Sequence, residues 1–157
     1  MKIGVIADSH DHMDNLAHIV NFFNKNSFDY IFHCGDIVSP FAVTLLNKLE
    51  MPYFGVYGNN DGEIMGLSDF SGAKIVKGPV VKDINGFKFA IFHEPVLVEY
   101  IKEDVNYVLY GHTHSAGLRR NGSQIILNPG TLAGYMSDKA SFAVIDTDKN
   151  SADIIEI

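Results

Sequence analysis

The sequence predicts an α/β protein in which two β-sheets pack face to face and helices lie outside them. In the first part of the chain, apolar runs of strand length alternate with segments whose apolar residues recur at helical spacing. In the rest of the chain, Asn-Gly pairs separate β-rich runs. The 157 residues, 46% of them hydrophobic and 20% charged, fit one compact domain spanning residues 1–157.

The first part predicts three strands joined by two helices. Residues 2–8 form a continuous apolar run, which is typical of a strand covered on both faces. Apolar residues then recur at helical spacing over 13–23, and residues 29–36 repeat the strand pattern. A second helical pattern covers 40–49, and residues 52–58 predict the third strand. This alternation indicates parallel strands joined by right-handed crossovers.

The second part predicts hairpins instead. Asn85-Gly86 and Asn121-Gly122 each lie between β-rich runs and favour tight turns. We therefore expect the sheet formed there to be mostly antiparallel. A further helix is expected at 95–104, and the remaining strands at 107–111, 141–146 and 152–157.

Charge and composition exclude several classes of protein. Twelve Lys and Arg against nineteen Asp and Glu give a net charge of -7, which disfavours binding to duplex nucleic acid. No apolar run approaches the ~20 residues that span a bilayer, so no membrane partner is expected. The first residues read as a strand rather than a signal peptide, and we therefore expect a cytoplasmic location. The single cysteine, Cys34, excludes a multi-cysteine zinc site, so any metal must use His, Asp, Glu or Asn.

Polar side chains follow five of the expected strands. Because ligands bind outside the carboxyl ends of the strands in open α/β sheets, we expect these side chains to meet at one edge. Five strand ends supply Asp8 and His10, Asp36, Asn59 to Asp61, His93, and His112 and His114.

The spacing of these residues is typical of metal ligation. Asp8 and His10, like His112 and His114, lie two residues apart, so that both side chains of a pair can point at one ion. The five ends together provide enough donors for two divalent ions, and a carboxylate such as Asp36 can bridge them. Two ions ~3.5–4 Å apart stabilise the entering and leaving oxygens of phosphoester hydrolysis. Imidazole, carboxylate and amide donors suit Mn, Fe, Ni, Co or Zn better than Ca or Cu(I).

These motifs, in this order, resemble those of the calcineurin-like metallophosphoesterase superfamily. The wording "HCGD", "YGNNDGE" and "YGHTH" is similar to that of the small single-domain archaeal and bacterial phosphodiesterases. The resemblance covers residues 1–131, because Asn128 to Thr131 resemble a late "NPGS" turn of that family. It implies a four-layer α-β-β-α sandwich of two mixed β-sheets flanked by helices.

The resemblance also implies two divalent transition-metal ions, with Mn, Ni, Fe, Co and Zn as the candidates. Asp36 would bridge the two ions, and a metal-bound hydroxide would attack phosphorus in line. By the same carry-over, the first ion is held by Asp8, His10, Asp36 and His114, and the second by Asp36, Asn59, His93 and His112.

The same resemblance implies roles in catalysis and substrate binding. Asn60 stands where many relatives have a histidine that contacts phosphate and can protonate the leaving group. We assign Asn60 and Asp61 to catalysis, Asp61 by orienting the turn, and Asn59, Asn60 and His12 to substrate binding. His12 has an equal alternative, a solvated position at a helix start. Glu94 stands where relatives have glycine, so it could repel substrate or act on a ligand from outside, and the Arg that follows the "NPGS" turn in several relatives is missing.

We therefore expect a two-metal phosphoesterase, and specifically a phosphodiesterase acting on small or activated diesters. The alternative is a catalytically weak or inactive scaffold, because the same fold occurs in a eukaryotic trafficking-complex subunit with a degraded site. None of the seven ligand positions is replaced here, which disfavours the scaffold. The metals alone leave hydrolysis of a non-phosphate ester open. Exposed antiparallel edges would permit a homo-oligomer, but no pattern in the sequence predicts one.

Overall fold

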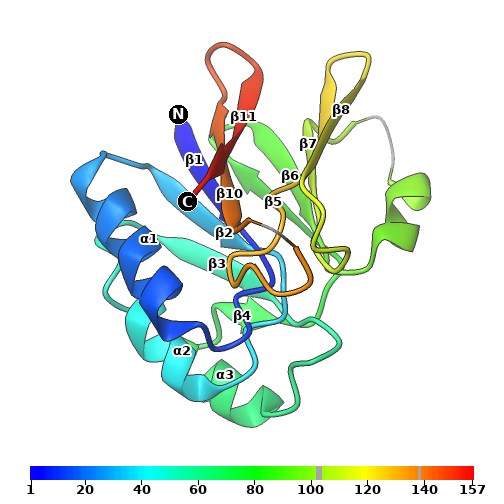
Figure 1. The fold of residues 1–157 in the computed structure, drawn as a ribbon. Coiled ribbons are helices and arrows are strands. Elements are labelled where there is room, and N and C mark those ends of the chain that lie inside the picture. The colour runs from blue at the N-terminus through cyan, green and yellow to red at the C-terminus, as the bar shows by residue number, and fades with distance from the viewer. Residues whose placement is uncertain (102–103, 138) are drawn as a thin grey trace.

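The computed structural model describes residues 1–101, 104–137 and 139–157. In it, two sheets pack face to face, and the helices lie outside them (Figure 1). The helices are α1 (Met13–Lys25), α2 (Pro40–Leu46), α3 (Ile64–Ser71) and a 3-10 helix (Pro95–Tyr100). The strands are β1 (Lys2–Ile6), β2 (Tyr30–His33), β3 (Tyr53–Val56), β4 (Ile75–Val76), β5 (Val80–Ile84), β6 (Phe87–Ile91), β7 (Tyr107–Leu109), β8 (Gly117–Asn121), β9 (Gln124–Asn128), β10 (Ser141–Asp146) and β11 (Ser151–Glu156).

Both sheets are mixed. The first runs in the order β11-β10-β1-β2-β3-β4, with β1 to β4 parallel and the hairpin of β10 and β11 added antiparallel to β1. The second runs β5-β6-β7-β9-β8, with antiparallel outer pairs and parallel inner pairs. The expectation of a mostly antiparallel second sheet is therefore wrong. The Asn-Gly turns form as predicted, but they fix only the pairs β5-β6 and β8-β9, whereas the long connection after β6 permits a parallel crossover to β7.

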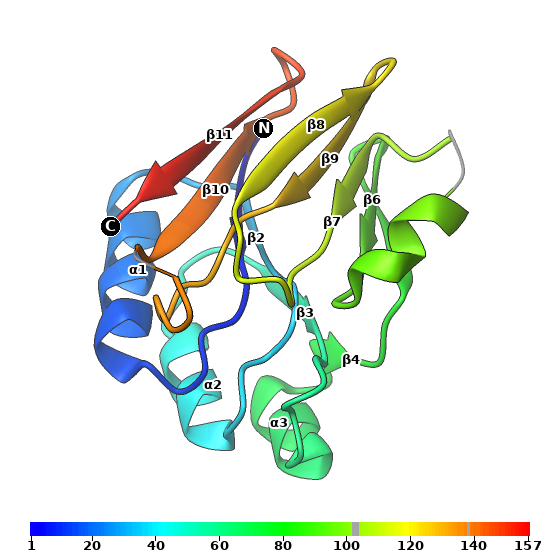
Figure 2. The ribbon, with the colours of Figure 1, turned by 45° about the vertical axis from the view of Figure 1, so that its right-hand side comes forward.

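Three apolar cores confirm the four layers. The core between the sheets contains Phe32 and Val5 of the first sheet against Phe89 and Leu109 of the second. A second core lies between the first sheet and the helices α1, α2 and α3, which cover its outer face (Figure 2). The third, smaller core packs the 3-10 helix against the outer face of β6, β7 and β9.

Three helical or strand assignments differ from the sequence predictions. The helix expected at 95–104 is a 3-10 helix that ends at Tyr100, and residues 102–103 lie outside the described part of the chain. The β-branched side chains of Val96 and Val98 lower the helix propensity of this short segment. The sequence pattern does not predict α3 or β4. With eight residues in α3 and two in β4, neither segment is long enough to show a clear periodicity of apolar residues.

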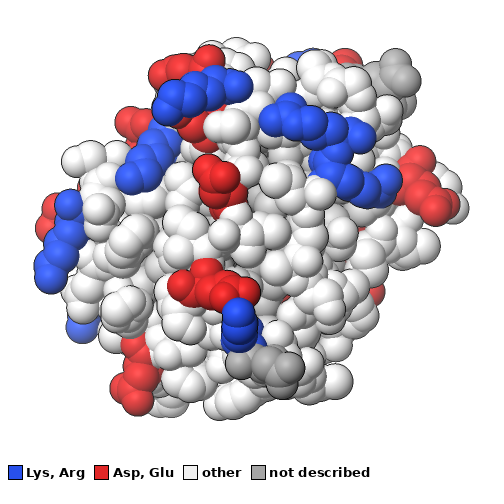
Figure 3. Space-filling model, turned by 45° about the horizontal axis from the view of Figure 1, so that its top comes forward, with Lys and Arg blue, Asp and Glu red and all other residues white. Residues whose placement is uncertain are grey.

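The surface carries mixed charge on the face formed by the hairpin tips. Figure 3 shows one small group of Lys and Arg side chains on that face, and elsewhere basic and acidic side chains stand next to one another, as Lys149 does with Asp146 at 3.0 Å. This face therefore offers no continuous basic surface of the kind that duplex nucleic acid requires. Among the described residues, every helix is too short or too polar to span a bilayer.

Candidate metal centre

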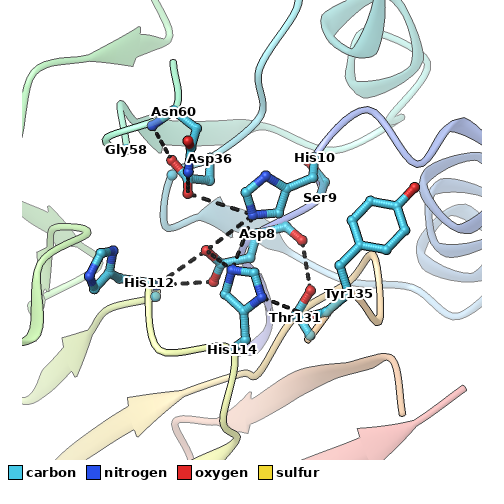
Figure 4. A network of polar contacts seen from close by, with 12 residues as sticks. Asp8, Ser9, His10, Asp36, Gly58, Asn60, His112, His114, Thr131 and Tyr135 are labelled. Atoms are coloured by element: carbon cyan, nitrogen blue, oxygen red, sulfur yellow. Dashed lines mark hydrogen bonds and ion pairs between the residues drawn. The ribbon is translucent and has the colours of Figure 1, made fainter. Parts of the chain in front are cut away.

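Four donors from three strand ends point toward one another (Figure 4). Asp8 and His10 follow β1, Asp36 follows β2 and His114 follows β7. Nε2 of His10 lies 3.1 Å from Nε2 of His114 and 3.6 Å from Oδ2 of Asp36. Nε2 of His114 lies 3.5 Å from Oδ1 of Asp8. One ligand atom from each residue lies within 4.8 Å of the others, so this first cluster could hold a metal ion.

A second cluster, formed by Asn59, His93 and His112, lies beside the first. Oδ1 of Asn59 lies 2.9 Å from Nε2 of His93 and 2.8 Å from Nδ1 of His112. Oδ2 of Asp36 lies 3.4 Å from Nε2 of His93. The same carboxylate oxygen therefore contacts both clusters. Together they bring all seven ligand positions named from the sequence to one edge of the sandwich.

Two of the histidine rings, those of His93 and His114, are oriented as metal ligands usually are. Nδ1 of His93 lies 2.8 Å from the carbonyl of Cys34, and Nδ1 of His114 lies 2.8 Å from the carbonyl of Tyr135. A ring that donates Nδ1–H to a carbonyl keeps the lone pair of Nε2 free, and Nε2 is the atom that faces the centre in both rings. Donor type and orientation thus fit a divalent transition metal.

Burial and contacts shift the pKa values of Asp8 and Asp36, the two carboxyl groups of the first cluster, in opposite directions. Burial raises the pKa of Asp8 to about 6, despite the nearby His93 and His114. Burial also acts to raise the pKa of Asp36, but contacts with His93 and Asn60 outweigh it and hold that pKa well below its usual range. Asp36 is therefore a carboxylate at neutral pH, as a bridging ligand must be.

Strained backbone accompanies the donors. Five of the seven ligand positions have a positive φ, between 41° and 71°: Asp8, His10, Asp36, His112 and His114. Residues other than glycine rarely adopt this conformation, and such residues cluster at functional sites. The tight turns let side chains two residues apart face the same centre.

Glycines in the same motifs allow the loops to approach closely. A Cβ at Gly58 would overlap the carboxylate of Asp36, and a Cβ at Gly111 would lie 3.0 Å from Oδ2 of Asp8. Side chains of the late "NPGT" turn hydrogen-bond to two of these loops. Thr131 Oγ1 donates to the carbonyl of Asp8, and Asn128 Nδ2 donates to the carbonyl of Gly111. The turn positions ligands without being one.

Of the four residues predicted to act on substrate, Asn59 lies in the second cluster, and the other three have different surroundings. Asn60 is exposed and donates from Nδ2 to Oδ2 of Asp36 at 2.7 Å, at the rim of the centre. Asp61 is buried and accepts four backbone N–H groups, two of them from Asp36 and Gly58. His12 is the N-cap of α1 and its Nδ1 accepts from Asn15 N, which favours the structural alternative for that residue.

The structure adds two features to the centre: Glu94, which was expected from the sequence either to repel substrate or to act on a ligand from outside, and the loop of Tyr135 and Met136, which was not predicted. The carboxylate of Glu94 lies 3.6 Å from Nε2 of His112, and it groups with His93 and His112 as a further potential metal donor. Tyr135 and Met136 line a cavity of 500 Å³ over both clusters. Glu94 could be recognised in the sequence only as a departure from the family pattern, and nothing in the sequence of the loop at 132–137 marks it as part of the site.

His33 supports the centre from the core. Its ring is fully buried, Gly35 N donates to Nδ1 at 3.2 Å, and Nε2 lies 3.0 Å from Ser9 Oγ. Burial lowers the pKa of His33 to about 3. The ring is therefore neutral, with Nε2–H directed at Ser9.

The low pKa of His33 predicts a pH-dependent stability of the metal-free protein. Between pH 6.5 and 3 the unfolded chain binds a proton at this ring that the folded chain does not, so stability falls as pH falls. From pH 7 to pH 5 this amounts to about 2 kcal/mol. Urea unfolding of His33→Gln should show a correspondingly weaker pH dependence than the parent. Equal pH dependence in both proteins would contradict the assignment.

Comparison with known proteins identifies the family that this chain resembles. Residues 1–150 match the family model of the calcineurin-like phosphoesterase superfamily domain. A phosphodiesterase of Methanocaldococcus jannaschii is 33% identical over 157 residues, which cover 95% of each chain.

Solved structures show the same relationship at the level of the fold. One, described as a novel archaeal phosphodiesterase, has a TM-score of 0.92 and 30% identity, with 100% of both chains covered. Vacuolar protein sorting 29 of Cryptosporidium parvum has a TM-score of 0.71 and 18% identity, covering 99% of this chain and 96% of that one. At 18% identity this second likeness concerns the fold alone.

Proposed function

This chain belongs to the calcineurin-like phosphoesterase superfamily and is a metal-dependent hydrolase of phosphoric esters; on this premise we propose that it holds two divalent ions and acts as a phosphodiesterase. The observation that carries the two-ion proposal is the position of Asp36 Oδ2, 3.6 Å from Nε2 of His10 and 3.4 Å from Nε2 of His93. One carboxylate oxygen within reach of both clusters is the arrangement of a bridging ligand. The seven ligands are those of the first and second clusters, with Asp36 shared.

Bound ions would supply an activated water and neutralise charge on the phosphate oxygens. The donors of imidazole, carboxylate and amide type favour Mn, Ni, Fe, Co or Zn. Asp61 would hold the loop of Asp36 in place, and Asn60 at the rim would contact a phosphate oxygen. Asn60 has no proton to give to a leaving group at neutral pH, so the proposal restricts the substrates to small or activated diesters whose leaving groups need no acid.

The scaffold alternative rests on the shared fold. The likeness to vacuolar protein sorting 29 concerns the fold alone, and a shared fold does not by itself imply a shared activity. The complete and mutually oriented donor set supports the enzyme instead.

The proposal is tested with metal-stripped protein that is reloaded separately with Mn, Ni, Co, Zn and Mg. We expect metal-dependent hydrolysis of an aryl phosphodiester, faster than that of the matched aryl phosphomonoester, and no hydrolysis of a carboxylic ester. Metal content after reloading should be two ions per chain. Two bound ions without turnover of either phosphoester would favour the scaffold, and a preference for the carboxylic ester would overturn the substrate class.

A further inference from the structure

A pocket of 370 Å³ opens beside the second cluster. It lies between the end of β3, the start of α3, the connection from β4 to β5, and the 3-10 helix. Its volume is within the range of small-molecule sites, ~300–1,000 Å³. The side chains that give it its character are Tyr57, Ile64, Phe92, Leu97, Lys77 and Glu94.

The pocket adjoins the metal centre. Asn59 lines both this pocket and the cavity over the two clusters, and His93 forms part of the pocket wall. A phosphate held at the centre would therefore have one ester oxygen directed either into the cavity or toward this pocket. The two ester groups of a diester require two such spaces, whereas a monoester requires one.

The lining favours an uncharged ring. Most of the wall is apolar or aromatic, so burying an apolar group there is favourable. The two charged side chains in the wall, Lys77 and Glu94, have opposite signs. Glu94 lies next to the ligand His112, and its carboxylate would repel a second phosphate at that end. A polyphosphate chain is thus a poor occupant.

We propose that this pocket binds one ester group of the substrate, a flat apolar ring of aryl or nucleobase size, and thereby selects ring-bearing diesters. This inference rests on the proposed function, because it requires phosphate at the metal centre. Leu97 is then a specificity-determining residue, since it contributes an apolar wall without belonging to either cluster.

The test compares two phosphonates that cannot be hydrolysed, methylphosphonate and phenylphosphonate, in calorimetric titrations of the manganese-loaded protein. Both carry the same anionic head, so their difference in affinity reports on the group attached to it. We expect phenylphosphonate to bind about tenfold more tightly, as burial of a ring predicts. Leu97→Trp, which fills the pocket, should remove this preference and leave methylphosphonate binding unchanged.

Val96→Trp is the matched control, because Val96 belongs to the same 3-10 helix, is 63% exposed and is not part of the pocket wall. Val96→Trp should still bind phenylphosphonate more tightly than methylphosphonate. If methylphosphonate binds but phenylphosphonate binds no more tightly, or if both variants behave alike, the pocket proposal is overturned while the proposed function stands. If neither phosphonate binds to the metal-loaded protein, both fail.

Discussion

Asp36→Asn is expected to lower phosphodiester turnover by about 1,000-fold or more, since the proposed function requires this carboxylate to serve two ions, and the substitution removes its charge. Asp36 is 1% exposed, and its Oδ2 faces His10 on one side and His93 on the other. An asparagine can present one oxygen to a metal, but its NH2 group cannot ligate. We therefore expect metal analysis to find one tightly held ion instead of two.

The loss should come from the site and not from the fold. In the absence of metal, the substitution keeps the shape of the side chain but weakens the hydrogen bonds that the carboxylate accepts from Asn60, so the free energy of unfolding of the metal-free protein should fall by about 1–2 kcal/mol, too little to unfold it. Asp69→Asn, an exposed carboxylate on α3, is the matched control and should retain both ions and full turnover. Asp36→Asn protein that keeps two ions and normal turnover would rule out the bridging role.

The positions of the donors could be predicted from the sequence because they depend on local pattern. Asp8, Asp36 and Asn59 each follow a buried run that reads as a strand, and parallel strands bring their carboxyl ends together. The pairing of the second sheet could not be predicted in this way. Its hairpin turns specify neighbours in sequence, but β7 pairs with β6 and β9 through contacts that no local signal encodes.

The backbone conformation at the metal centre could not be predicted from the sequence either. Positive φ at Asp8 and His10 is rare for residues other than glycine, and at both residues it occurs where the backbone N–H donates to the neighbouring β2 loop, to the carbonyls of Gly35 and Asp36. Glu94 is similar: its proximity to His112 depends on two loops that are distant in sequence. Residues that break the expected pattern therefore lie close to the chemistry, where the fold overrides local preference.

Asp61→Ala is expected to lower the free energy of unfolding by about 3 kcal/mol, because it leaves four backbone donors without an acceptor. Asp61 is 4% exposed and accepts the N–H groups of Asp36, Ile37, Val38 and Gly58 at 2.6 to 3.1 Å. Burial raises the pKa of Asp61, and the hydrogen bonds from Gly58, Val38 and Ile37 act against that rise. The carboxylate thus joins the loop of Asp36 to the loop of Asn59, one loop from each cluster.

The same substitution should impair the centre beyond its effect on stability. With the two loops released, Asp36 and Asn59 lose their fixed separation, and we expect kcat to fall about 100-fold even where the protein is fully folded. Asp61→Asn keeps one acceptor oxygen and should recover part of both losses. Asp83→Ala, which removes a single exposed hydrogen bond to Gly86 N, is the matched control and should cost about 0.5 kcal/mol with no change in kcat. Urea unfolding and steady-state kinetics on the same preparations test this. If Asp61 had only a structural role, Asp61→Ala would lower the free energy of unfolding, but the folded fraction would keep the kcat of the parent protein.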